Sequence, residues 1–74
     1  MDLILLTRAA QSAFNKANYS RAEAEQNALA IASYLSDPDN LAACCKLYQT
    51  DDETDLAYHL AKTIIEAAQS KPTP

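Results

Sequence analysis

The complete absence of glycine is the feature that most constrains how this chain of 74 residues can fold. Valine and tryptophan are also missing, whereas fifteen residues are alanine and nine are leucine. Alanine and leucine are among the best helix formers, and β-branched residues, which favour strands, are scarce here. Rossmann and P-loop phosphate sites need glycine where the backbone approaches the phosphate, so both are excluded. The composition therefore predicts an all-α fold, a small bundle of three to four helices.

The length allows a single domain, which we expect to span residues 1–69, with residues 70–74 as a disordered C-terminal tail. A domain of this size buries only about 60% of its unfolded surface, and each alanine adds little apolar area. Small domains compensate with disulfides, a metal or self-association. Cys44 and Cys45 are adjacent and have no second pair, so no disulfide staple is indicated. We therefore expect a homodimer, or a complex with a larger partner, to complete the bundle.

Hydrophobic periodicity predicts a first helix over residues 2–17 and a second over residues 21–36. The apolar stripe of the first comprises Leu3, Leu6, Ala10, Ala13, Phe14 and Ala17. Ile4 and Leu5 lie off this stripe, so packing within the chain does not account for them. Ser20 and Glu23 have the spacing of a capping box. Small residues in the second stripe predict close antiparallel packing of the two helices; that stripe comprises Ala24, Ala28, Ile31, Ala32 and Leu35.

Pro38 marks a break, after which we expect a helix over residues 39–48. Its two sides are both apolar, which predicts that it is sandwiched between neighbours. Thr50 and Glu53 form a second possible capping box, before a fourth helix over residues 51–69. We expect this helix to form the core around Leu60, with a face wider than one neighbour fills. That face comprises Leu56, Ala57, Leu60, Ala61, Ile64, Ile65, Ala67 and Ala68. We therefore expect the first and fourth helices to hold the dimer.

Side chains suited to catalysis or metal binding are few. His59, the single histidine, follows Asp55 by four residues on the polar side of the fourth helix, which predicts a surface pair. No sequence feature marks a nucleophile or a pocket beside it. Cys44 and Cys45 point about 100° apart on a helix and lack further ligands at zinc-site spacing. We interpret them as small buried hydrophobes in a reducing cytoplasm, and we expect no enzyme activity, no cofactor and no metal.

Ten acidic and six basic side chains give a net charge of −4, and the basic residues are scattered singly. Direct binding of nucleic acid is therefore not expected. Residues 3–6, the longest nearly apolar run, are too few to cross a bilayer, so no membrane association is expected. The densest charges form the acidic cluster, which we define as Asp51, Asp52, Glu53 and Asp55. Carboxylates suit a helix N-terminus, and they also offer a surface for a basic partner.

Two tyrosines lie away from the centres of the apolar stripes: Tyr34 off the stripe of its helix, and Tyr58 at the edge of its own. Tyrosine is favoured at protein interfaces, where it gives contact area at low entropic cost. We therefore expect a small acidic cytoplasmic protein that acts by binding another protein, as an adaptor, regulator or inhibitor. The expected interface combines Ile4, Leu5, the two tyrosines and the acidic cluster.

A second hypothesis is a phage-type inhibitor of a nucleic-acid-handling or defence complex, whose carboxylates occupy a basic groove in place of phosphate. The distribution of charge separates the two hypotheses. Carboxylates in a stripe at phosphate-like spacing favour mimicry, and scattered carboxylates favour the adaptor.

Overall fold

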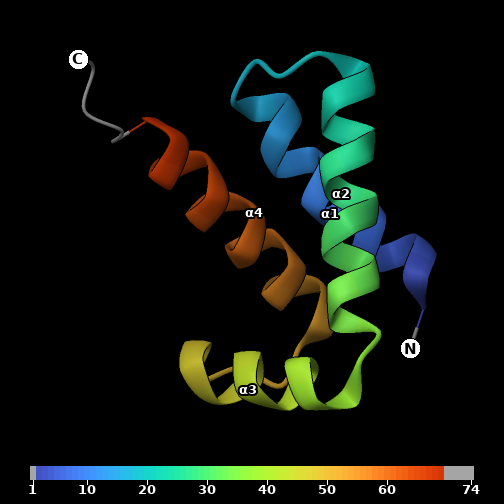
Figure 1. Cartoon of the computed structure of the whole chain (residues 1–74), viewed down its shortest axis with the longest axis vertical. Coiled ribbons are helices and arrows are strands. Elements are labelled where there is room, and N and C mark those ends of the chain that lie inside the picture. Colours follow the sequence, from blue (N-terminus) through green and yellow to red (C-terminus); the bar gives the residue numbers. More distant parts are fainter. Residues whose placement is uncertain (1, 70–74) are drawn as a thin grey trace.

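The computed structural model describes residues 2–69, which form four helices (Figure 1). They are α1 (Leu3–Lys16), α2 (Arg21–Leu35), α3 (Pro38–Tyr48) and α4 (Glu53–Gln69). No strand occurs among the described residues, so the predicted all-α bundle is confirmed. The expected tail, residues 70–74, lies outside the described residues. α1 packs against both α2 and α4. α3 follows α2 in the chain, lies across one end of the bundle and leads into α4.

Side-chain oxygens cap the first three helices. Asp2 Oδ1 accepts a hydrogen bond from the backbone N–H two residues later, at 3.0 Å. Ser20 Oγ accepts from the Glu23 N–H at 3.2 Å, which confirms the serine half of the predicted capping box, while the Ser20 hydroxyl donates to Glu23 Oε1 at 3.0 Å. Asp37 caps α3, with Pro38 at the first helical position. Proline has no N–H to leave unpaired there, so α3 begins one residue earlier than predicted.

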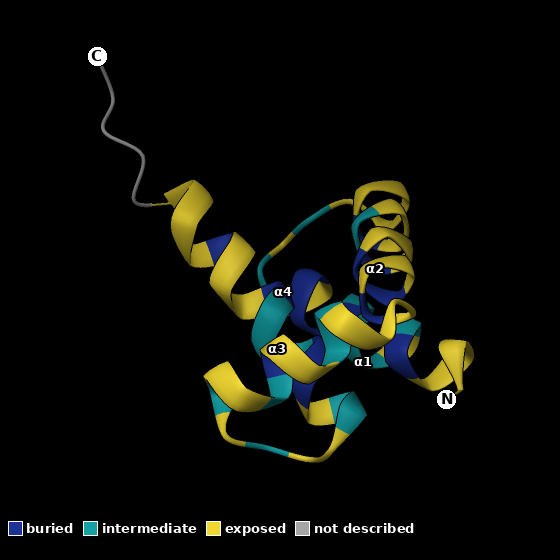
Figure 2. Ribbon diagram, turned by 60° about the horizontal axis from the view of Figure 1, so that its bottom comes forward, coloured by how far each residue is buried: buried dark blue, intermediate teal, exposed yellow. Residues whose placement is uncertain are grey.

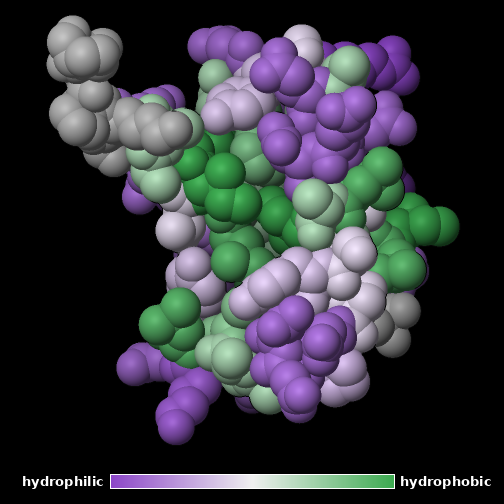
Figure 3. Space-filling model, viewed as in Figure 1, coloured by the Kyte–Doolittle hydropathy of each residue, from purple (hydrophilic) through white to green (hydrophobic). Residues whose placement is uncertain are grey.

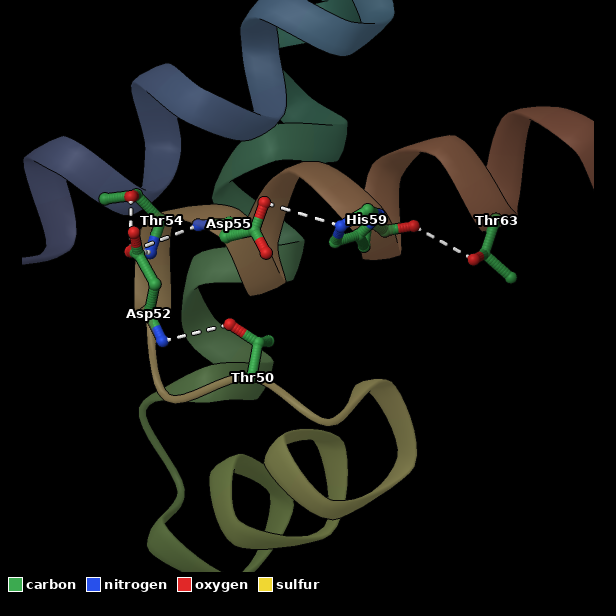
Figure 4. Close-up of polar contacts among 6 residues, drawn as sticks. All are labelled: Thr50, Asp52, Thr54, Asp55, His59 and Thr63. Atoms are coloured by element: carbon green, nitrogen blue, oxygen red, sulfur yellow. Dashed lines mark hydrogen bonds and ion pairs between the residues drawn. The ribbon is translucent and has the colours of Figure 1, made fainter.

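The start of α4 differs from the prediction, because Asp52 and not Thr50 caps the helix (Figure 4). Asp52 Oδ1 accepts hydrogen bonds from the backbone N–H of Thr54 at 3.0 Å and of Asp55 at 3.3 Å, and from the Thr54 hydroxyl at 2.7 Å. Thr50 Oγ1 instead accepts from the Asp52 N–H at 3.2 Å. A carboxylate has more lone pairs for these donors than a hydroxyl, so α4 begins at Glu53, two residues later than predicted.

Two turns use a left-handed residue in a chain that has no glycine. Asn18, after α1, has φ 67°, and Gln49, after α3, has φ 56° and ψ 45°. The N–H groups of Gln49 and Thr50 both donate to the carbonyl of Cys45, which closes the end of α3. Asparagine adopts this conformation readily, whereas a residue such as Gln49 bears a steric cost of about 1–2 kcal/mol from its Cβ.

The core lies between α1, α2 and α4, on the sides that these helices turn toward one another (Figure 2). Half of its residues are alanine, which allows the helices to approach closely but buries little area per residue. The buried residues are Leu6, Ala10, Ala13, Phe14, Ala24, Ala28, Ile31, Ala32, Leu35, Cys44, Leu56, Ala57, Ala61 and Ile65. The predicted stripe of α2 is confirmed in full, and that of α1 is confirmed except at its ends, Leu3 and Ala17.

Two packing predictions were wrong. α3 is not sandwiched, because Leu47 is 73% exposed and Cys44 is the single residue of α3 in the core. Leu60 is half-buried, and the largest fully buried residue of α4 is Leu56. The face of α4 is nevertheless wider than its neighbours cover, as predicted, since Ile64 is 45% exposed.

Candidate functional site

A groove separates α2 from α4. Both helices pack extensively on α1 but contact one another much less, and they diverge from the end where α3 lies (Figure 1). The groove has a volume of about 300 Å³. Its walls are apolar apart from one amide and one phenol hydroxyl, and are formed by Asn27, Ala30, Ile31, Tyr34, Leu60 and Ile64. Hydrophobic surface gathers between the two helices in the space-filling view (Figure 3).

A second apolar hollow lies on the opposite flank of α2, beside the start of α1. It has a volume of about 250 Å³ and is lined by Leu3, Ile4, Thr7, Arg8 and Leu29. Ile4 is 69% exposed and Leu29 is 53% exposed. At 100° per residue, Leu29 and Tyr34 stand about 140° apart on α2. α2 therefore forms a ridge with apolar surface on both of its sides, which Figure 3 shows.

The ridge carries no charge. Residues 26–36 contain no acidic or basic side chain, although Gln26, Ala30 and Ser33 are all exposed. We define the α2 face as these exposed or half-exposed residues of the ridge and its groove: Gln26, Asn27, Leu29, Ala30, Ser33, Tyr34, Leu60 and Ile64. Depletion of charge together with exposed aliphatic and aromatic side chains is the composition of an interface centre.

The excess of acidic over basic side chains lies at the α3 end of the molecule. Residues 37–55 hold six acidic side chains and one lysine, whereas residues 2–36 hold three of each sign and residues 56–69 hold one of each. Part of this charge is used within the fold, since Asp37 and Asp52 cap helices. The Thr54 hydroxyl, followed by the N–H groups of Asp55 and Thr54, lowers the pKa of Asp52. The carboxylates therefore do not form a free stripe over the whole segment.

His59 serves to attach α3 to α4. Its Nε2 lies 3.4 Å from Asp55 Oδ1, which confirms the predicted pair (Figure 4). Its ring also stacks on Tyr48 of α3, with centroids 5.9 Å apart and planes 11° apart, a contact that the sequence did not predict. Tyr48 Oη lies 3.0 Å from Thr63 Oγ1, and Thr63 in turn donates to the His59 carbonyl at 2.9 Å. These contacts are structural, and His59 lines none of the hollows described.

Tyr58 lies away from the α2 face, in a hollow of about 240 Å³ between α1 and α4. It is half-buried, and two ammonium groups flank its ring: Lys16 Nζ at 5.5 Å and Lys62 Nζ at 6.0 Å from the centroid. A further hollow, of about 500 Å³, is a polar depression along α1 alone, lined by Arg8, Gln11, Ser12, Asn15 and Lys16. Neither hollow gathers apolar anchors as the groove does.

The eight predicted interface residues thus lie in several places. Tyr34 joins the groove, Ile4 lines the hollow beside Leu29, Leu5 is 50% exposed at the start of α1, and Tyr58 lies between the lysines. The acidic cluster lies at the start of α4, where Asp51, Asp52 and Asp55 are exposed and Glu53 is half-buried. Sequence reasoning missed Leu29 and Ala30, and it placed Ile64 on the wide apolar face of the fourth helix without naming it as an interface residue. The uncharged run of residues 26–36 was the signal that points to the first two.

The cysteines show no sign of a reactive site. Cys44 is buried, Cys45 is half-buried, and both are free thiols. Burial, and to a lesser extent the neighbouring Cys45, raises the pKa of the Cys44 thiol. A raised pKa keeps the thiol protonated and unreactive at neutral pH. Among residues 2–69, no three side chains of histidine, cysteine, aspartate or glutamate come together as metal ligands would.

The helices of the described segment are all too short or too polar to span a bilayer. Comparison of the chain with protein-family models, curated proteins and solved structures gave no match. The geometry and chemistry of the α2 face are therefore the basis for a functional hypothesis.

Proposed function

We propose that this protein acts by binding another protein through the α2 face, as an adaptor, regulator or inhibitor, and not as an enzyme. The observation that carries the proposal is the apolar groove between α2 and α4, bordered by a ridge without charge. Asn27, Ile31 and Tyr34 follow one another along two turns of α2. Two turns are the length over which a partner helix presents its i, i+3 or i+4, and i+7 anchors to a groove.

Exposed apolar area provides the driving force for binding. Leu29, Tyr34 and Ile64 are 53%, 49% and 45% exposed, so about half of each side chain still meets water. Full burial of a large apolar side chain is worth about 1.5–3 kcal/mol, so covering the exposed half contributes about 1 kcal/mol each. Ala30 and Ser33 between them are small and let a partner backbone approach closely.

The arrangement of polar groups supports a non-enzymatic role. A general base needs a nucleophile or a substrate proton within hydrogen-bond reach, in a site that shields the reaction from water. The His59 ring faces Tyr48 and Asp55, and the Thr63 hydroxyl donates to a backbone carbonyl. Both groups are therefore engaged in holding α3 and α4 together.

The proposal is tested with an affinity-tagged chain and a single charge placed on the ridge. Ala30→Arg puts a guanidinium at the groove, and Ala43→Arg puts the same group on exposed α3 as a matched control. Proteins captured from the source cell are compared by quantitative mass spectrometry. We expect a partner that is retained by the wild type and the control but lost with Ala30→Arg. Identical capture by all three chains would contradict binding through the α2 face.

We also propose self-association and a cytoplasmic location. Half of the core residues are alanine, so the isolated chain buries little apolar area and gains stability from covering more. Both cysteines are free, which suits a reducing compartment. Light scattering coupled to size exclusion measures the first property. A mass of twice the 8.1 kDa chain is expected, and a folded monomer at every concentration would contradict it.

A second candidate function, inhibition by acidic mimicry, rests on the concentration of negative charge in one segment, although these carboxylates do not form the continuous stripe that favours mimicry over the adaptor. Residues 37–55 hold the whole negative charge imbalance of the described chain. Asp51→Asn with Glu53→Gln removes two charges and leaves the caps at Asp37 and Asp52 in place. If the chain is a mimic, it competes with DNA for a basic DNA-binding protein, and this double variant competes less well at low salt. Equal competition by both chains, or none by either, would contradict mimicry.

A further inference from the structure

The groove between α2 and α4 has an acidic side chain at each of its ends on α2. Glu23 precedes the groove residue Asn27 by four residues, so the two lie on the same side of the helix. Asp37 follows Tyr34 by three residues, and its N–H donates to the Tyr34 carbonyl at 3.4 Å. Glu23 and Asp37 are both exposed and are fourteen residues apart, about 21 Å along a helix. The apolar wall of the groove thus lies between two carboxylates.

The other wall of the groove also begins with a carboxylate. Glu53 precedes Leu60 by seven residues, or two helical turns, and therefore lies on the same side of α4 as the groove. It belongs to the segment 37–55, in which Lys46 is the one basic side chain among six acidic ones. The α3 end of the groove is therefore the more acidic of the two.

The other charges of α2 lie away from the groove and offset one another. Measured around the helix from Asn27, Arg21 lies at about 120° and Glu25 at about 160°. Arg21 and Glu25 are four residues apart and opposite in sign, so they are neighbours on the outer side of the helix. The carboxylate of Glu23 is therefore the charge that α2 presents beside the groove.

The other charges of α4 are also directed elsewhere. Lys62 and Glu66 both lie about 160° around the helix from Ile64, and both line the hollow between α1 and α4. Asp55 lies 3.4 Å from His59 in the contact with α3. Within the described part of the chain, no basic side chain lines the groove. A partner therefore meets an apolar centre with negative charge at both ends.

We propose that the α2 face binds a basic amphipathic helix of another protein, whose apolar side fills the groove and whose lysine or arginine side chains lie beside the carboxylates at both ends. This inference rests on the proposed function and names the chemistry of the partner. The apolar contacts supply the affinity, and the charges at the rim set the position of the helix and speed its association. A helix with acidic ends would be repelled at both ends.

A synthetic peptide tests the proposal. It carries a fluorescent label, is about 18 residues long, or about 27 Å as a helix, and has leucines at i, i+3 and i+7 between end turns that contain lysines. We expect it to bind the purified chain in an anisotropy titration, more weakly as salt is added. Two matched peptides should bind at least tenfold more weakly, one with glutamate in place of lysine and one with serine in place of leucine. Equal binding of either matched peptide would overturn the proposal.

Removal of the two carboxylates tests where the basic ends lie. Glu23→Gln with Asp37→Asn keeps both capping functions, because the amide oxygens accept the same hydrogen bonds. The affinity for the basic peptide should fall about three- to tenfold at low salt. Glu25→Gln with Asp2→Asn is the matched control, since it removes two charges away from the groove and keeps the cap of α1. Equal losses in the two double variants would overturn the proposal.

The capture experiment with Ala30→Arg separates this inference from the proposed function. If the peptide does not bind but a captured partner is lost with Ala30→Arg, the α2 face binds a protein of different chemistry, and the basic helix alone is wrong. If the wild type and Ala30→Arg bind the peptide equally, the peptide lies elsewhere and the inference is overturned. If capture is also unchanged by Ala30→Arg, the proposed function falls as well. We expect saturating peptide to reverse self-association, since both cover the same apolar surface.

Discussion

Replacing Gln49 with glycine should stabilise this protein, although most substitutions destabilise a fold. Gln49 closes α3 in the left-handed conformation, at φ 56° and ψ 45°. Its Cβ costs about 1–2 kcal/mol in that region. Glycine removes this cost but gains freedom in the unfolded chain, which costs about 0.4–1 kcal/mol. With both costs taken near the middle of their ranges, the difference predicts a net stabilisation of about 0.5–1 kcal/mol.

The measurement is thermal unfolding followed by circular dichroism. For a domain of this size, 1 kcal/mol moves the melting temperature by about 4–8 °C, so Gln49→Gly should raise it by about 2–8 °C. Gln49→Ala keeps the Cβ and should give no such rise. Asn18→Gly should gain less than Gln49→Gly, because asparagine already tolerates its φ of 67°. If Gln49→Gly and Gln49→Ala melt together, steric strain at this turn is not the cause.

Three further predictions follow from burial and hydrogen bonding. Leu56→Ala should lose about 2–5 kcal/mol in urea unfolding, whereas exposed Leu47→Ala should lose less than about 0.5 kcal/mol; equal losses would contradict the assigned core. Because the pKa of Asp52 is lowered in the fold, its stabilisation is present above the unfolded value of about 3.9 and is lost as pH falls through the folded value. Asp52→Asn should therefore show a shallower decline in acid, and an unchanged decline would argue against this cap. A thiol-specific reagent should modify Cys45 well before Cys44, because burial raises the pKa of Cys44; simultaneous modification of the folded chain would contradict this.

Local chemistry made much of the fold predictable from the sequence. The stripe of α2 and the cap at Ser20 follow from neighbouring residues alone, since periodicity and spacing determine both. The sequence did not decide whether Thr50 or Asp52 caps α4, because either residue stands at an acceptable distance before the helix. The hydrogen bonds of the folded chain decide for Asp52. The exposure of α3 was also missed, because an apolar pattern does not reveal how many neighbours a helix has.

The candidate site depends on how helices diverge, which a single sequence does not specify. Tyr34 was identified because it lies off its own stripe, but its proximity to Leu60 and Ile64 comes from the packing of α2 and α4 on α1. The stacking of Tyr48 on His59 joins residues from two helices and has no local signature. Tertiary geometry therefore supplied the groove, while the sequence supplied the apolar residues that line it.

Amide chemical shifts recorded over a dilution series test the central claim, that the α2 face is a protein-binding surface, through the self-association proposed for this chain. The purified, isotope-labelled chain is diluted from the millimolar to the low micromolar range. We expect concentration-dependent shifts at residues 26–34 of α2 and at Leu60 and Ile64 of α4. The polar outer side of α1, represented by Gln11 and Asn15, should not change. Shifts confined to the acidic end, or spectra that do not change over the whole range, would contradict the account.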